Sequence, residues 1–187
     1  MLNYDSPVKQ NIKINNLEIK EISPVMKLIL RGKKREFLSS IGKLLNVILP
    51  SESNTSTIGS NITALWLSPD EWLIHSNNQI DKGNNNYEIE NVLTNNISKN
   101  NLGAVTDVTD QFVMLNLKGN NVYELFSKGC PFNFNEFKNK KGAVTQTIIS
   151  KIDVIIHNKD INDINLFVRR SFSDHLWYWL DDGCRFL

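Results

Sequence analysis

The stretches VMKLILRG (residues 25–32) and FVMLNLKG (residues 112–119) share one pattern, and this pattern decides the fold. In residues 26–30 apolar side chains recur at every second position, which is typical of a half-buried strand, and residues 112–117 also alternate. A glycine, Gly32 or Gly119, ends each stretch. Each half of the chain therefore contains a strand that a glycine closes.

An amphipathic helix is predicted after each glycine. The apolar positions of the first helix are spaced at i, i+4, i+7, i+8 and i+11, and Pro50 ends it. The second helix is followed by Gly129, where a C′ glycine belongs. The inward-facing residues are Phe37, Ile41, Leu44, Leu45 and Ile48 in the first helix and Val122, Leu125 and Phe126 in the second.

Further strands continue both halves. They cover residues 62–67 and 72–75 in the first half and residues 144–149, 154–157 and 164–169 in the second. The segment DEWLI (residues 70–74) parallels DINLF (residues 163–167), and each leads toward a helix, the first after a polar loop at 77–86. A repeat of roughly 90 residues predicts the α+β class, with two ferredoxin-like units at residues 1–101 and 102–187. Chance similarity between two generic α+β patterns is the alternative.

The last helix is predicted to start at a capping box from Ser171 to Asp174. Its apolar face comprises Phe172, Leu176, Trp179 and Leu180. On a helical wheel, Trp177 lies on the flank of this face and Tyr178 lies nearly opposite it. Large aromatic side chains outside the core need cover, either from the rest of the chain or from a partner protein, for which Trp and Tyr are preferred anchors.

The strand before this helix also has two distinct faces. Ile164, Leu166 and Val168 point to one side, and Phe167 and Arg169 point to the other. A small unit with helices on one side of its sheet leaves the opposite face in need of cover. We therefore expect a partner interface that includes Phe167, Arg169, Trp177 and Tyr178.

Composition excludes several classes of protein. The chain has 187 residues, and its 21 basic and 20 acidic residues give a net charge of +1, which argues against nucleic-acid binding. Its two cysteines, Cys130 and Cys184, cannot form a disulfide scaffold or a four-ligand metal site. No apolar run approaches the ~18 residues of a membrane span, and no secretory signal opens the sequence. A cytoplasmic protein without a membrane segment is expected.

The chemically active residue types do not converge on a motif. The three histidines, His75, His157 and His175, lack the i, i+4 spacing of a helical zinc pair. Cys130 follows a predicted helix C-terminus, where the helix dipole disfavours a thiolate. GxGxxG, GxxxxGK[ST] and GxSxG motifs are absent from the sequence. The sequence therefore predicts no catalytic, cofactor-binding or metal-binding residue.

Four segments carry a resemblance to a known family. They are LWLSPDEWL (65–73), VTDVTD (105–110), SKGCPF (127–132) and LFVRRSFSDHLW (166–177). In order and spacing they resemble the gamma subunit of heterotetrameric sarcosine oxidase, over about residues 17–182. The last segment is the most specific, because a string mixing Arg, Ser, Phe and Trp rarely recurs by accident.

The resemblance implies a subunit of a complex that oxidatively demethylates sarcosine to glycine. Tetrahydrofolate accepts the one-carbon unit, and oxygen is reduced to peroxide. Alpha and beta subunits would hold FAD, FMN, NAD and tetrahydrofolate, and a delta subunit would hold zinc. The gamma subunit would hold none of these, have an aminomethyltransferase-like folate-binding fold, and contact the alpha subunit.

Two other roles fit the same fold. A folate-dependent iron–sulfur maintenance family carries a Lys-Gly-Cys-Tyr-x-Gly-Gln-Glu motif, but here Lys128-Gly129-Cys130 is followed by PFNFN (131–135). That family's role is therefore not transferred, although a free-standing folate-binding protein stays an alternative. The second alternative is the small subunit of an N-methylglutamate dehydrogenase-type complex. The sequence does not distinguish that substrate from sarcosine, because the substrate would bind elsewhere in the complex.

Overall fold

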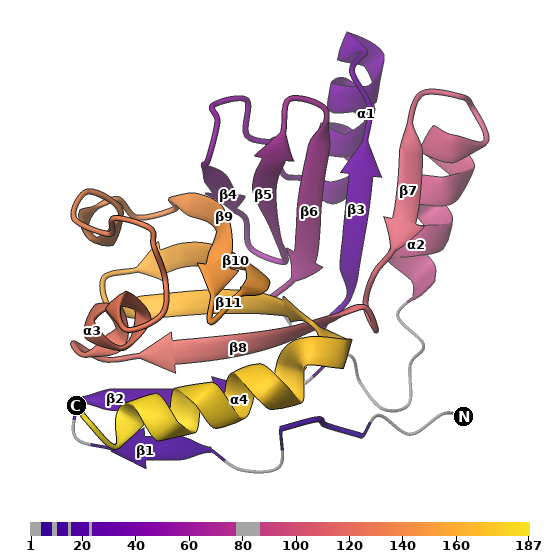
Figure 1. Ribbon diagram of the computed structural model, residues 1–187. Coiled ribbons are helices and arrows are strands. Elements are labelled where there is room, and N and C mark those ends of the chain that lie inside the picture. The colour runs from indigo at the N-terminus through magenta and orange to yellow at the C-terminus, as the bar shows by residue number, and fades with distance from the viewer. Residues whose placement is uncertain (1–4, 9–10, 15, 23, 78–86) are drawn as a thin grey trace. The chain divides into compact units, whose positions relative to one another are not determined.

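The computed structural model describes every residue except 1–4, 9–10, 15, 23 and 78–86. Of the expected loop at 77–86, only Asn77 is therefore among the described residues. The chain forms two units (Figure 1), which we call the middle unit (residues 24–109) and the terminal unit (residues 1–23 and 110–187). This division differs from the expected units 1–101 and 102–187, because the N-terminal strands pair with the second half of the chain.

The middle unit contains a five-stranded antiparallel sheet with the order β4-β5-β6-β3-β7. Its elements are β3 (Lys27–Arg31), α1 (Arg35–Leu45), β4 (Ser56–Ile58), β5 (Ile62–Ser68), β6 (Glu71–Ser76), α2 (Tyr87–Leu93), the π-helix η1 (Thr94–Ser98) and β7 (Ala104–Asp107). The predicted strands and helices of this half are present, although α1 ends earlier than predicted. The short strands β4 and β7 were not predicted from the sequence.

The terminal unit contains a six-stranded antiparallel sheet with the order β1-β2-β8-β11-β10-β9. Its elements are β1 (Ile12–Ile14), β2 (Leu17–Glu21), β8 (Phe112–Lys118), α3 (Val122–Ser127), the 3-10 helix η2 (Phe137–Asn139), β9 (Val144–Ile149), β10 (Ile152–Asp160), β11 (Asp163–Arg169) and α4 (Arg170–Cys184). Helices α3 and α4 pack on one face of this sheet (Figure 1).

The two units repeat one topology. The order β7-β3-β6-β5-β4 in the middle unit corresponds, position by position, to β2-β8-β11-β10-β9 in the terminal unit. Each unit is therefore a ferredoxin-like strand and helix pattern with an extra edge strand, β4 or β9, and the terminal unit has β1 in addition. In the middle unit the strand after the second helix, β7, completes the sheet. In the terminal unit the N-terminal strand β2 takes the same position.

Equivalent glycines close the first strand of each repeat. The Gly32 amide donates to the Asp70 carbonyl (3.0 Å), and the Gly119 amide donates to the Asn162 carbonyl (2.9 Å). Gly119 has a φ of +134°, and a Cβ atom there would lie 2.0 Å from the Asn16 carbonyl oxygen. Glycine is required at residue 119 both for the backbone conformation and for the close approach of the β1–β2 turn.

The second hairpin of each repeat shares a further irregularity. The β5–β6 register shifts between Trp66 and Ser68, and the β10–β11 register shifts between Asn158 and Asp160. An ion pair then joins the end of the first strand to the hairpin. It is Arg31–Glu71 (3.8 Å) in the middle unit and Lys118–Asp163 (3.2 Å) in the terminal unit. These shared details favour duplication over chance similarity.

The core of the middle unit corrects the predicted end of α1. Phe37 and Ile41 are buried as expected, but the helix ends at Asn46, which has a left-handed φ of 50°, and not at Pro50. Because the chain turns there, Ile48 is 78% exposed and Leu44 is also exposed. The expectation that these two residues face the core is wrong.

The core of the terminal unit corrects the predicted face of α4. The buried face comprises Ser173, Leu176, Trp177, Leu180 and Cys184. Trp177 is therefore a core residue, whereas Phe172 is half-exposed. The expected capping box is also absent, since α4 starts at Arg170 and no side chain caps it. The Ser173 hydroxyl instead donates to the Arg170 carbonyl (2.7 Å).

Trp179 lies at the edge of this buried face, over Gly129. A Cβ atom at Gly129 would lie 2.4 Å from Trp179 Cζ2. Gly129 follows α3, as predicted, but it is not among the glycines with positive φ. Its role is close packing against the indole and not a left-handed helix end.

Replacing Gly119 by alanine tests the need for glycine after β8. We expect Gly119→Ala to lower the free energy of unfolding by about 3 kcal/mol, because the new Cβ atom adds strain and a backbone clash. Urea denaturation measures the effect. Gly42→Ala is the matched control, because the nearest atom to its Cβ position in α1 lies 3.8 Å away. This control should gain about 0.5–1 kcal/mol from helix propensity. Equal stability of the two variants would contradict the role of Gly119.

Truncating two neighbouring aromatics tests the corrected face of α4. Trp177→Ala should lower the free energy of unfolding by about 3–5 kcal/mol, because it leaves a cavity in the core. Tyr178→Ala should change it by at most about 0.5 kcal/mol, because Tyr178 is 67% exposed. Thermal and urea unfolding of the two variants give the comparison. If Trp177→Ala is as stable as wild type, Trp177 lies outside the core, as the helical wheel predicted.

Candidate partner interface

The structure places the four predicted interface residues in different environments. Phe167 is fully buried in β11, and Trp177 is 8% exposed within the core. Arg169 is exposed at the end of β11, and Tyr178 is 67% exposed on α4. Of the four, Arg169 and Tyr178 thus offer side-chain surface to a partner in this conformation.

The predicted faces of β11 are those seen in the structure. Ile164, Leu166 and Val168 belong to the helix-facing core, and Phe167 and Arg169 alternate with them. Register with β8 places Phe167 opposite Met114 and Arg169 opposite Phe112.

The exposed side of α4 carries an aromatic surface. We define the outer face of α4 as Phe172, His175, Tyr178 and Trp179, which lie at i, i+3, i+6 and i+7. Phe172 is 50% exposed, His175 is exposed, and Trp179 is partly buried. Residues three and four apart are neighbours on a helix, so these rings form one continuous strip. The helical wheel did not predict that Phe172 is exposed. It cannot distinguish between Phe172 and Trp177, which are equally suited to a core.

The C-terminal end of α4 is held by polar contacts. Lys128 Nζ donates to the carbonyls of Gly183 (2.9 Å) and Phe186 (3.0 Å), and it lies 5.9 Å from the centre of the Phe186 ring. A cation beside the last carbonyls of a helix complements the helix dipole. Arg185 adds an exposed ion pair to Asp181 (3.2 Å). The aromatic strip therefore lies on a helix whose end is fixed.

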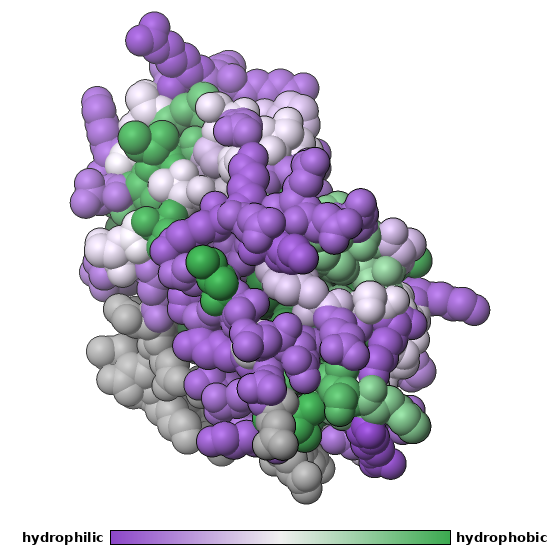
Figure 2. Space-filling model, turned by 90° about the vertical axis from the view of Figure 1, so that its left-hand side faces the viewer, coloured by the Kyte–Doolittle hydropathy of each residue, from purple (hydrophilic) through white to green (hydrophobic). Residues whose placement is uncertain are grey.

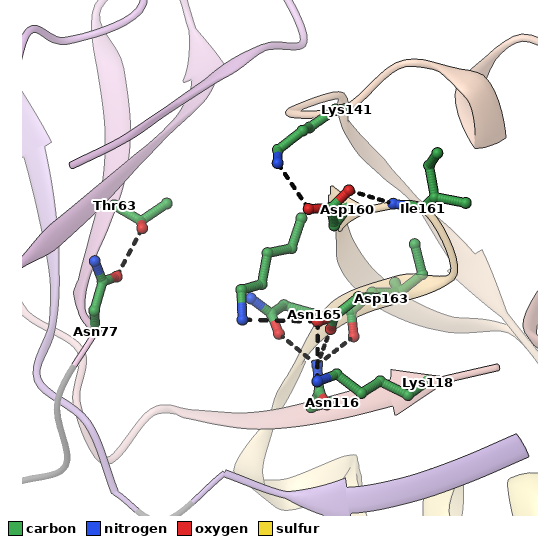
Figure 3. Close-up of polar contacts among 11 residues, drawn as sticks. Thr63, Asn77, Asn116, Lys118, Lys141, Asp160, Ile161, Asp163 and Asn165 are labelled. Atoms are coloured by element: carbon green, nitrogen blue, oxygen red, sulfur yellow. Dashed lines mark hydrogen bonds and ion pairs between the residues drawn. The ribbon is translucent and has the colours of Figure 1, made fainter. Parts of the chain in front are cut away.

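A polar network lies on the side of the terminal sheet away from the helices (Figure 3). Asn116 Nδ2 donates to Asp163 Oδ1 (2.6 Å), to Asn165 Oδ1 (3.1 Å) and to the Ile164 carbonyl (3.2 Å). Lys118 pairs with the same carboxylate. The Asp163 carboxylate is thus engaged by an amide and an ammonium group, so it is poorly suited to act as a general base.

The cysteine thiols are buried within the terminal unit. Burial raises the pKa of Cys184 to about 11, with a smaller contribution from Asp181 in the same direction. Cys130 is also buried, with its sulfur 3.7 Å from the hydroxyl oxygen of Thr147. A thiol with a raised pKa is a weak nucleophile at neutral pH, because little thiolate is present. Cys184 is therefore poorly suited to nucleophilic chemistry.

The phenol of Tyr123 is another buried polar group of this unit. Its hydroxyl is buried without a hydrogen-bond partner in the described part of the chain, and burial raises the pKa of Tyr123 to about 12. The ring packs against Phe134, with ring centres 5.5 Å apart. Tyr123 therefore belongs to an aromatic cluster and has no proton acceptor beside it.

Neither a metal centre nor a membrane span is found among the residues that the structure describes. Outside the undescribed ranges, no three His, Cys, Asp or Glu side chains lie close enough to bind a metal ion. None of the helices in the same residues has the length and apolar character needed to cross a bilayer. Figure 2 shows one face of the molecule, on which hydrophobic surface occurs as small patches within a mainly hydrophilic surface.

Comparison with solved structures shows the fold. A heterotetrameric sarcosine oxidase from Corynebacterium sp. U-96, in complex with pyrrole 2-carboxylate, matches with a TM-score of 0.78 and 21% identity, over 89% of this chain and 83% of that chain. The glycine cleavage system aminomethyltransferase T from Bartonella henselae matches with a TM-score of 0.62 and 11% identity, over 88% of this chain and 45% of that chain. The expected aminomethyltransferase-like α+β fold is confirmed.

Comparison with protein families gives the identity. No curated protein sequence matches the chain significantly. The model of the sarcosine oxidase gamma subunit family matches residues 33–185, which include most of both repeats and all of α4. The resemblance carried by the four quoted segments is therefore confirmed. The chain belongs to the sarcosine oxidase gamma subunit family and is thus a subunit of an oxidoreductase complex.

Proposed function

We propose that this chain is a non-catalytic assembly subunit of a cytoplasmic oxidase complex that demethylates sarcosine to glycine, with tetrahydrofolate accepting the one-carbon unit. The family match over residues 33–185 carries this proposal. Alpha and beta subunits would bind FAD, FMN, NAD and tetrahydrofolate, and a delta subunit would bind zinc. This chain would bind none of them and would hold its partners in place.

The chemistry of the buried polar groups supports a role without catalysis. Asp163 is occupied by Asn116 and Lys118, and Cys184 has a raised pKa. His175 is exposed on α4, and within the described part of the chain we see no hydrogen bond that joins it to a nucleophile or to a second base. A catalytic base needs a reactive group within hydrogen-bond reach, so His175 is better suited to a surface role.

The outer face of α4 is the surface that we propose contacts the alpha subunit. Aromatic residues are enriched at the centres of protein interfaces, and exposing several of them on one helix is otherwise unfavourable. Tyr178 supplies a ring and a hydroxyl, Phe172 supplies an apolar ring, and Arg169 supplies a charge where α4 begins. Phe167 and Trp177 are buried, so the proposal keeps Arg169 and Tyr178 of the four predicted residues.

The isolated chain should have no oxidase activity. We expect the purified protein to be colourless and to release no peroxide from sarcosine in the presence of tetrahydrofolate, because in this proposal the flavins are bound by the other subunits. A peroxide assay measures this. Turnover comparable to that of a complete oxidase would contradict the proposal. Calorimetric binding of tetrahydrofolate with micromolar affinity would instead favour the free-standing folate-binding protein.

Charge on the outer face of α4 should weaken assembly. Tyr178→Glu is expected to raise the dissociation constant for the remaining oxidase subunits at least about tenfold, as loss of an interface anchor does. Leu38→Glu is the matched control, since Leu38 is 39% exposed on α1. Co-purification and titration of the two variants, each checked by circular dichroism, give the comparison. If Tyr178→Glu binds with wild-type affinity, the interface lies on another surface of the chain.

A further inference from the structure

The segment SKGCPF (residues 127–132) carries part of the family resemblance, yet the proposed function gives it no role. It begins with the last residue of α3 and continues into the chain that follows this helix. Four of its residues contact other parts of the terminal unit, and we call them together the α3 joint: Lys128, Gly129, Cys130 and Phe132. Their contacts explain why these residue types occur here.

Lys128 fastens the end of α4. Its ammonium group donates to the carbonyls of Gly183 (2.9 Å) and Phe186 (3.0 Å). One side chain therefore satisfies a carbonyl in the last turn of the helix and another just beyond it, where helices leave such groups open. The contacts join segments 55 and 58 residues apart in the sequence, so they are part of the tertiary structure and not of the helix itself.

Gly129 makes room for the indole of Trp179. A Cβ atom at residue 129 would lie 2.4 Å from Trp179 Cζ2 and 3.0 Å from Trp179 Cη2, so a side chain there would displace the ring or the helix that carries it. The Gly129 carbonyl accepts a hydrogen bond from the Ser150 amide (3.0 Å), which holds the joint to the turn between β9 and β10. Close packing is therefore the reason for glycine at this position.

Cys130 and Phe132 anchor the joint in the core of the terminal unit. Cys130 is 8% exposed, and its sulfur lies 3.7 Å from the hydroxyl oxygen of Thr147 on β9. The Phe132 ring packs edge-on against Phe134 and Phe137, with ring centres 5.0 and 5.6 Å apart. The joint is thus held by contacts of its own, in addition to those that it makes with α4.

We propose that Lys128 and Gly129 are positioning residues for subunit assembly, which hold the last turns of α4 so that its outer face meets the alpha subunit in one geometry. The inference rests on the proposed function, in which the outer face of α4 is the contact surface. Tyr178 and Trp179 lie in the part of the helix that these two residues hold. A surface that is ordered before binding loses less conformational entropy when the partner docks. Removing the support should therefore weaken assembly.

A direct contact between the Lys128 ammonium group and a carboxylate of the partner is the alternative, because Lys128 is exposed. An ammonium group has three donors, and two of them are engaged by the carbonyls of Gly183 and Phe186. The same group lies 5.9 Å from the centre of the Phe186 ring. These contacts within the chain favour the positioning role, and the two explanations predict different coupling with Tyr178.

The first test changes Lys128 in the full chain and measures binding to the remaining oxidase subunits, purified together. Lys128→Met should raise the dissociation constant about tenfold, whereas Lys128→Arg keeps the donors and should stay within about twofold of wild type. Lys138→Met also removes one positive charge and is the control, since Lys138 is exposed on η2. In a Tyr178→Ala background, Lys128→Met should have less than about a threefold effect, because the support acts through the surface to which Tyr178 belongs.

The second test changes the contact between Gly129 and Trp179. Gly129→Ala should weaken binding about tenfold, because the new methyl group collides with the indole. Trp179→Phe removes the ring atoms that would collide, so adding Gly129→Ala to it should change the affinity by less than about twofold. Hydrogen exchange of the free chain gives an independent measurement. In Lys128→Met the backbone amides of residues 178–187 should exchange faster, while those of β8, β10 and β11 keep their protection.

The outcomes separate this inference from the proposed function. Wild-type chain that fails to bind the other subunits, or Tyr178→Glu that binds normally, overturns both. Wild-type affinity in Lys128→Met and Gly129→Ala, with Tyr178→Glu impaired, overturns the positioning role alone. An equal effect of Lys128→Met with and without the Tyr178 ring overturns it in favour of a direct contact. Unchanged hydrogen exchange in residues 178–187 also overturns it. Circular dichroism and thermal midpoints within about 4 °C of wild type show that each variant is folded.

Discussion

Antiparallel pairing of β2 with β8 is the interaction on which the terminal unit depends. It places Ile19 opposite Leu117 and Glu21 opposite Leu115, so that Leu17 and Ile19 enter the same core as α3 and α4. Without β2, β8 would be an open edge and that core would lose one wall. The close approach of Asn16 to Gly119 follows from the same pairing, because β2 begins directly after the turn that contacts the glycine. Residues from both ends of the sequence thus form one hydrophobic core.

Local patterns predicted most of the strands and helices, and long-range packing decided the rest. The alternation of side chains was sufficient to predict β3 and β8. In each strand the apolar residues face the core of its own unit and lie within a few residues of one another in the sequence. The partner of β2 could not be predicted, since pairing partners far apart in sequence leave no local signal. The end of α1 depended on Asn46 adopting a left-handed conformation, which asparagine tolerates but does not require. A prediction from hydropathy alone therefore extended the helix to Ile48.

The candidate interface was predictable only in part. Tyr178 was expected to be exposed and is exposed, because the opposite side of an amphipathic helix follows from its period alone. Phe172 and Trp177 have roles opposite to those predicted, since both are large aromatic residues near the boundary of the apolar face and the helical period alone does not distinguish them.

The placement of β2 also has a consequence for biosynthesis. Ribosomes deliver the chain from its N-terminus, so β2 emerges before β8, from which about 90 residues of sequence separate it. At translation rates of roughly 5–20 residues per second, the strand waits some 5–20 s for its partner, while all strands of the middle unit are synthesised in between. Leu17 and Ile19 are exposed to water and to other nascent chains during this interval. The residues that alternate with them, Glu18 and Lys20, carry charges of the kind that protects exposed strands from premature pairing.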